Sequence, residues 1–276
     1  MSDTPHEERY SLSFTTDTPP QRVISLVPSI TESLFDLQLG DRVIGITDYC
    51  IHPQDKIAHL PRLGGPKNPD IEQIIALQPD LVLMNAEDNR LQDAQKLQDQ
   101  GIAVWTSHPR TVQEAINLLW EFMNVFDEPS MSERVRWIER QMDWVASAAR
   151  VTAPVKVFVP IWYDPWMSFT AETFMHNLLL TCGGLNIFAE YRAATRYPHV
   201  TLEEIIEAQP AVVLLPGEPY EFNETHVAEI AALNIPAAQT NRIHLVDGAL
   251  LTWHGTRLAQ ALIEIPPLLS SGSTED

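Results

Sequence analysis

Aromatic side chains recur in polar, turn-forming segments of the chain, outside the regular patterns of a core. Aromatic rings bury a large area at little cost in conformational entropy, so they suit contact with a large planar ligand. The alternative is that some of these rings fill the core or anchor turns. The segments are TDYCIHP with Tyr49, IWYDPWM with Trp162 and Trp166, TRYPHV with Tyr197, and LTWHG with Trp253.

Side chains that bind metals lie in or near the same segments. Cys50 and His52 form a Cys-x-His pair, and imidazole and thiolate can bind a transition metal directly or at an axial position of a metal chelate. The chain has nine histidines, so some of them lie in loops without any ligand. The other candidates are His108, His199 and His254.

Two segments of the chain are similar in sequence. Asp70–Leu83 reads DIEQIIALQPDLVL and Thr201–Leu214 reads TLEEIIEAQPAVVL, with seven of fourteen positions identical. Each copy has the pattern of a helix ended by proline and followed by a strand. This predicts two homologous α/β lobes. The alternative is a helix–proline–strand unit that recurs without common origin.

Glu72 and Glu203 occupy the same position in the two copies. A carboxylate in the first turn of a helix is favourable for the helix dipole, which is the simplest explanation of each. Their equivalence raises a second one, in which the pair binds basic groups of a two-fold symmetric partner.

Short β-rich runs alternate with helical patterns in both halves of the chain, which predicts parallel βαβ units. Ser29 and Glu32 are expected to form a capping box after the first strand. An anion could bind at that helix N-terminus, although most such termini only cap a helix. Ser130 and Glu133 are expected to cap a central helix of about five turns.

We expect five segments along the chain, and two facing lobes create a cleft in which a ligand can bind. They are an N-terminal extension (1–20), an N-terminal α/β lobe (21–110), a linking helical segment (111–153), a C-terminal α/β lobe (154–267) and a disordered tail (268–276).

Composition and motifs exclude several classes of protein. The 276 residues carry 18 basic and 37 acidic side chains, a net charge of −19, which argues against a nucleic-acid or anionic-membrane binder. Apolar runs are too short for a membrane-embedded protein. The chain has no GxGxxG after a strand, no phosphate loop and no HExxH, CxxC or GxSxG motif, which favours binding over catalysis.

The first twenty residues lack the pattern of an export signal, so we expect a cytoplasmic protein, or a periplasmic one whose leader was removed.

In combination, the motifs resemble the class III, helical-backbone periplasmic binding proteins, which serve ABC importers of cobalamin, iron–siderophore complexes and haem. The resemblance covers about Gln21 to Ile265 and is greatest for the cobalamin-binding branch. The motifs are RVISLVPSITESLF, NPDIEQIIALQPDLVL, CGGLNIF and YPHVTLEEIIEAQPAVVLL, with the long middle helix.

The resemblance implies two Rossmann-like α/β lobes with central parallel sheets, joined by a long rigid helix, with the ligand cleft between them. It implies that Tyr49 and Tyr197 face the corrinoid and that Glu72 and Glu203 dock onto arginines of an ABC permease dimer. Other corrinoid-facing aromatics of that branch fall here on residues such as Asn85 and Ile161.

We therefore expect a monomeric, non-enzymatic protein without a covalent cofactor that binds a metal chelate, with a corrinoid preferred. The expected ligand contacts are Ser29, Tyr49, Trp162, Trp166, Tyr197 and Trp253. The alternatives are an iron–siderophore complex, haem, a bare transition-metal ion bound by the histidines, or an enzyme that acts on a tetrapyrrole.

Overall fold

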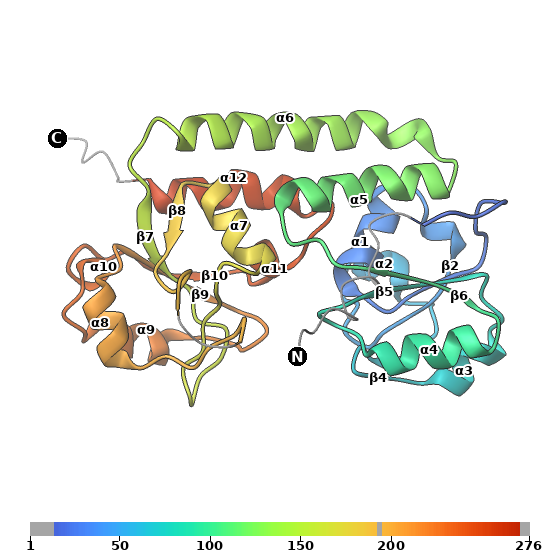
Figure 1. Ribbon diagram of the computed structural model, residues 1–276, viewed down its shortest axis with the longest axis horizontal. Coiled ribbons are helices and arrows are strands. Elements are labelled where there is room, and N and C mark those ends of the chain that lie inside the picture. The colour runs from blue at the N-terminus through green and yellow to red at the C-terminus, as the bar shows by residue number, and fades with distance from the viewer. Residues whose placement is uncertain (1–13, 192–194, 271–276) are drawn as a thin grey trace, which may run out of the picture. The chain divides into compact units, whose positions relative to one another are not determined.

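A computed structural model describes residues 14–191 and 195–270 of the chain. Residues 1–13 of the expected N-terminal extension and 271–276 of the expected tail lie outside the described residues. The chain divides into two compact units, each built around a parallel sheet (Figure 1). Among the described residues, unit 1 comprises 14–109, Gln113–Trp137 and His254–Arg257, and unit 2 comprises Arg110–Val112, 138–191, 195–253 and 258–270.

The sheet of unit 1 has four parallel strands in the order β2-β1-β5-β6. Both of its faces are covered, as continuous apolar strands require. On one face, Ile74 of α3 and Leu97 of α4 pack with Val82 in one apolar cluster. On the other, Trp105 of β6 meets Phe122 of α5 at 5.0 Å between ring centroids. The strands are β1 (Val23–Ser25), β2 (Val43–Ile46), β5 (Leu81–Asn85) and β6 (Ala103–Ser107), and the helices are α1 (Pro28–Asp36), α2 (Gln54–Ile57), α3 (Ile71–Ala76), α4 (Leu91–Asp99) and α5 (Val112–Val125).

The sheet of unit 2 has four parallel strands in the order β10-β9-β7-β8. Helices α8, α9 and α10 cover one face with a cluster that includes Ile205, Ile230 and Ala237, and α7 and α12 lie over the other (Figure 1). The strands are β7 (Val155–Phe158), β8 (Gly184–Asn186), β9 (Val212–Pro216) and β10 (Ile243–Val246), and the helices are α7 (Phe174–Thr181), α8 (Leu202–Ala208), α9 (Glu224–Ala231), α10 (Pro236–Gln239), α11 (Ala249–Thr252) and α12 (Leu258–Leu269).

Both sheets follow the same order when their strands are numbered within each unit, namely 2-1-3-4. The two copies of the repeated sequence form α3–β5 in unit 1 and α8–β9 in unit 2, so they occupy equivalent places. The expected α/β fold with two parallel sheets is confirmed.

Helix α6 (Ser132–Ala149) begins in unit 1 and ends in unit 2. Its 18 residues make five turns, as expected. The predicted cap at Ser130 is wrong, because Ser130 lies in the short 3-10 helix Pro129–Met131, where Glu128 accepts a hydrogen bond from its amide.

Helix α12 ends later than expected. The expected C-terminal lobe ends at residue 267, yet this helix continues through Pro266 and Pro267 to Leu269. Leu269 is buried, so packing of the last turn outweighs the lost backbone hydrogen bonds. Two residues of the predicted tail, Leu268 and Leu269, are therefore helical.

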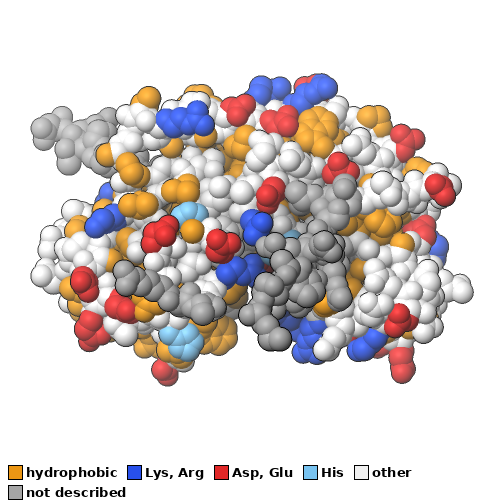
Figure 2. Space-filling model, viewed as in Figure 1, with side chains coloured by type: hydrophobic (Ala, Val, Ile, Leu, Met, Phe, Trp, Pro, Cys, Tyr) orange, Lys and Arg blue, Asp and Glu red, His pale blue; other side chains and the backbone are white. Residues whose placement is uncertain are grey.

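No helix among the described residues is both long and apolar enough to span a membrane. Acidic side chains are spread over the face shown in Figure 2, with Lys and Arg among them. The excess acid of the composition therefore forms no single patch on this face.

Candidate functional site

The loop after β2 carries three of the predicted site residues, Tyr49, Cys50 and His52. In parallel α/β sheets, ligands bind beyond the carboxyl ends of the strands, which is where this loop emerges. The Tyr49 side chain is 65% exposed, whereas Cys50 is buried. Burial raises the pKa of the Cys50 thiol, and hydrogen bonds with Thr31 and Thr47 oppose that effect only in part. Cys50 is therefore a neutral anchor of the loop, while Tyr49 presents its ring.

A histidine–carboxylate pair lies at the carboxyl ends of β5 and β6. The Nε2 atom of His108, just after β6, lies 2.8 Å from Oε1 of Glu87, just after β5. His254 is buried near both groups, and burial, aided by the charge of His108, lowers its pKa to about 4. The His254 ring is therefore neutral at physiological pH.

Gly255 allows the segment that carries His254 to pack on α1. Its φ is +115°, and a Cβ at this position would lie 2.2 Å from the Ser33 hydroxyl oxygen. Ser33 accepts a hydrogen bond from the amide of Thr256, at 3.1 Å. Glycine is thus required by both the backbone conformation and the close approach.

The expected capping box at Ser29 is wrong. Pro28 occupies the first helical position of α1, so the N-cap is Val27, which makes no side-chain cap. Ser29 is buried in the first turn, and Glu32 pairs with Arg257 at 2.5 Å. The basis for an anion site at Ser29 is accordingly weakened, because Pro28 supplies no amide donor.

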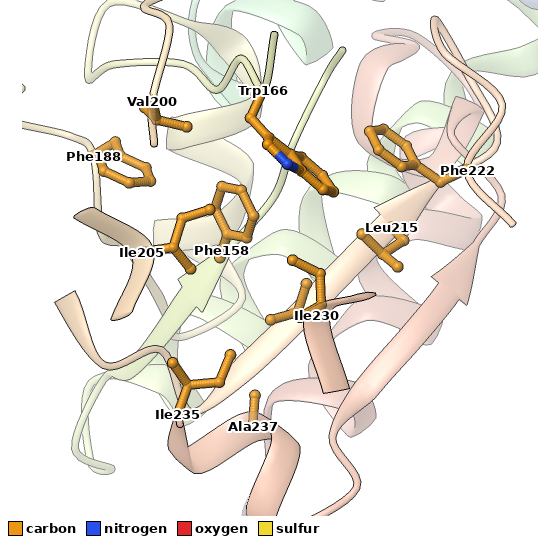
Figure 3. Packing of buried hydrophobic residues seen from close by; sticks show 11 residues of the cluster. Phe158, Trp166, Phe188, Val200, Ile205, Leu215, Phe222, Ile230, Ile235 and Ala237 are labelled. Carbon is orange, nitrogen blue, oxygen red and sulfur yellow. The ribbon is translucent and has the colours of Figure 1, made fainter. Parts of the chain in front are cut away.

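In unit 2, the loop after β7 carries two tryptophans, of which Trp162 lies on the surface and Trp166 lies in the core. Trp162 is 46% exposed, and its ring meets Tyr220 edge-on at 5.4 Å. Trp166 is 7% exposed and stacks on Phe222 at 5.7 Å (Figure 3). The structure therefore places Trp166 in the core, which leaves its ring faces covered, and Trp162 on the surface.

Hydrogen bonds fix both ends of this loop. The Ile161 amide donates to the Met167 carbonyl at 2.9 Å, and the Met167 amide donates to the Trp162 carbonyl at 3.1 Å. Trp162 therefore stands at the base of a closed turn, where its ring is held against Tyr220.

The segment after β8 carries Tyr197 and His199. It pairs with the Trp162 loop, since the Val200 amide donates to the Trp166 carbonyl at 2.9 Å. Tyr197 is half-buried with the Arg196 guanidinium 5.9 Å from its ring centroid, and His199 is exposed. Trp253, at the end of α11, is 8% exposed.

Glu72 and Glu203 are both exposed in the first turn of equivalent helices, α3 and α8. Each helix has a side-chain cap. The Asp70 carboxylate accepts from the Gln73 amide, and the Thr201 hydroxyl accepts from the Glu204 amide. These caps fix the first turn of each helix, which carries Glu72 or Glu203.

The candidate metal ligands are dispersed. Within residues 14–191 and 195–270, no group of three or more His, Cys, Asp or Glu side chains is arranged to hold a metal ion. Cys50 is bound by threonine hydroxyls and His108 by a carboxylate, so the structure does not gather the predicted ligands into one set.

Sequence reasoning missed the residues that support the site. Glu87 contacts His108 from 21 positions away in the chain, and only its position after β5 could have pointed to it. Tyr220, which contacts Trp162, lies in PGEPYEF, a loop segment whose aromatic residue the sequence does show. Arg62, which donates to two carbonyls of the Tyr49 loop, carries no sequence signal.

Comparisons with known proteins agree with this architecture. A family model described as "Periplasmic binding protein" matches residues 23–250. The vitamin B12-binding protein of Vibrio parahaemolyticus serotype O3:K6 is 25% identical over 254 residues, which are 90% of this chain and 88% of that protein.

Solved structures share the fold. The periplasmic vitamin B12-binding protein BtuF of Vibrio cholerae matches with a TM-score of 0.78 and 22% identity, over 91% of this chain and 97% of its own. The periplasmic haem-binding protein RhuT of Roseiflexus sp. RS-1 matches with a TM-score of 0.72 and 20% identity, over 90% and 97%. The chain therefore belongs to the periplasmic binding protein family, in its class III, helical-backbone type.

Proposed function

We propose that this protein binds a metal chelate without catalysis and that the chelate is a corrinoid such as cobalamin. One observation carries the proposal. Each unit presents an exposed aromatic ring beyond the carboxyl ends of its sheet, Tyr49 in unit 1 and Trp162 in unit 2. Such rings can cover a large planar ligand. The relatives named for vitamin B12 support this choice of ligand.

The proposed contacts are graded by exposure. Tyr49, Trp162 and the half-buried Tyr197 contact the ligand through their rings. Trp166 and Trp253 are less than one-tenth exposed, so they act at most through an edge or by supporting the surface.

We further propose that the protein delivers its ligand to an ABC permease dimer through Glu72 and Glu203. Both carboxylates are exposed at the start of equivalent helices, as a two-fold symmetric partner with basic groups requires.

Replacing both glutamates by alanine is expected to abolish uptake in cells while ligand affinity stays within twofold. The matched control is Glu207→Ala, which removes another exposed carboxylate of α8. Unchanged uptake in the double variant would contradict the docking role.

A second candidate ligand is haem or another iron chelate. The pair formed by His108 and Glu87 favours it, because histidines that bind metals commonly hydrogen-bond a carboxylate. An absorption titration with haem is expected to show an axial-histidine spectrum that His108→Ala removes, if this candidate is right. A bare metal ion has less support, since the described residues contain no cluster of ligands for one.

The family is one of periplasmic binding proteins. The expected cytoplasmic location rests on the pattern of the first twenty residues, most of which (1–13) lie outside the described part of the chain. The location therefore stays a prediction, and so does the monomeric state.

Calorimetric titration with cyanocobalamin, haem and a ferric siderophore tests the proposal. We expect heat with cyanocobalamin and a stoichiometry of one. Absence of binding by all three would overturn the assignment to metal chelates, and binding of haem alone would favour the second candidate.

A further inference from the structure

Several hydrogen bonds hold the turn that carries Tyr49. The Arg62 guanidinium donates to the carbonyls of both ends of the turn, Thr47 at 3.0 Å and Cys50 at 2.7 Å. Within the turn, the Cys50 amide donates to the Thr47 carbonyl at 3.2 Å. The Arg62 side chain thus links the two residues that flank Asp48 and Tyr49, and we call this pair of hydrogen bonds the clasp.

A buried polar cluster fixes the same turn to the first strand and helix. The Cys50 thiol lies 3.2 Å from the hydroxyl oxygens of both Thr31 and Thr47. Thr31, in α1, donates in turn to the hydroxyl of Ser25, the last residue of β1, at 2.9 Å. A buried polar network with its partners in place favours one geometry, because any other leaves groups unpaired.

The residues on either side of Cys50 have their side chains on the surface, whereas the Cys50 side chain is buried. Cys50 is 1% exposed, whereas Tyr49 and Ile51 are among the most exposed large apolar side chains of the described residues. The ring of Tyr49 rests on Gly65, where an added Cβ would lie 3.3 Å from its Cε2 atom. The Asp48 amide also donates to the Gly64 carbonyl at 2.9 Å, so the β3–β4 hairpin (Gly64–Gly65 and Asn68–Pro69) supports the ring.

We propose that Arg62 and Cys50 are positioning residues that hold Tyr49 and Ile51 as a preorganised apolar platform for the planar ligand. The inference rests on the proposed function and adds two things to it, a second contact residue, Ile51, and the device that fixes the surface. A surface that is already ordered loses less entropy when the ligand binds, so its affinity is higher.

The first test needs no ligand. Arg62→Gln removes the clasp but keeps a polar side chain, and Arg140→Gln, an exposed arginine of α6, is the matched control. Hydrogen exchange followed by mass spectrometry on peptides that span residues 46–52 is expected to be at least fivefold faster in Arg62→Gln than in the wild type or control. Equal rates in all three proteins would overturn the clasp, whatever the protein binds.

The second test is a double-mutant cycle with cyanocobalamin. Arg62→Gln alone is expected to weaken binding about tenfold, yet to have no further effect in a background that carries both Tyr49→Ala and Ile51→Ala, because Arg62 acts through these two side chains. Additive losses would show that Arg62 acts elsewhere and would overturn the positioning role. The exchange measurement reports the clasp without ligand, so its failure is distinct from a failure of the corrinoid assignment.

Discussion

Among single residues, His254 ties the stability of the fold most directly to pH. Burial lowers its pKa from 6.5 to about 4, so the folded protein resists protonation that the unfolded chain accepts. Its contribution to the free energy of unfolding is complete above pH 6.5 and is lost as pH falls toward 4. The expected loss from pH 7 to pH 4 is about 3 kcal/mol.

Urea unfolding at several pH values between 7 and 4 measures this loss. The variant His254→Gln is expected to show a shallower decline of stability with falling pH. His199→Gln, which changes an exposed histidine, is expected to follow the wild type. If the stability of His254→Gln and of the wild type fell equally with pH, His254 would not be the source of the loss.

The two tryptophans of IWYDPWM show where sequence reasoning about residues stops. Both have the same neighbours and the same expected role, yet Trp162 is exposed and Trp166 is buried. Part of the difference comes from Phe222 and His226, which pack against Trp166 and lie 56 and 60 positions further along the chain. Local pattern cannot report such a contact, whereas the exposure of Tyr49 agrees with its polar, turn-forming neighbours.

Among the elements, α1 carries two ion pairs that differ mainly in burial. Glu32 pairs with Arg257, with side chains 15% and 9% exposed, and Asp36 pairs with Arg134, with side chains 33% and 41% exposed. Arg257→Ala leaves a poorly solvated carboxylate without its partner and is expected to cost about 3 kcal/mol of unfolding free energy. Arg134→Ala is expected to cost under about 1 kcal/mol. Chemical denaturation compares the two, and equal losses would contradict the structural account of the segment 254–257.

Gly255 makes the same segment sensitive to a single methyl group. Gly101 also has a positive φ but has open space around an added Cβ. Gly101→Ala is therefore expected to cost about 1 kcal/mol through backbone strain alone, and Gly255→Ala at least about 2 kcal/mol more through the clash with Ser33.

Thermal and urea unfolding of both variants measure the difference. A Ser33→Ala substitution combined with Gly255→Ala removes the clashing oxygen and is expected to recover part of the loss. Equal costs for the two glycine variants would show that the close approach at Ser33 does not matter.

The repeated elements were the most predictable part of the fold. In α3–β5 and α8–β9, a proline after the helix and an apolar strand agree with the packing that the structure shows. The capping box expected at Ser29 failed because Pro28 begins the helix two residues earlier, so that Val27 takes the N-cap position. The three residues of β8 were missed because their pairing with β7, not their pattern, makes them a strand.

For the molecule as a whole, the repeat, the matched strand orders and the family membership agree on two equivalent α/β units. The fold class was predictable because it depends on alternation along the chain. The contacts around the candidate site were not predictable, since the support of Tyr49 by Arg62 and of His108 by Glu87 arises from loops that meet only after folding.

One calorimetric comparison tests the proposed binding of a corrinoid by the exposed rings of Tyr49 and Trp162. Cyanocobalamin is titrated into the wild type, Tyr49→Ala and Trp162→Ala, with Trp144→Ala on α6 as a control for loss of an exposed tryptophan. We expect one-to-one binding by the wild type and the control, and affinity lowered about tenfold or more in each of the two site variants. Wild-type affinity in both site variants, or no binding by the wild type, would contradict it.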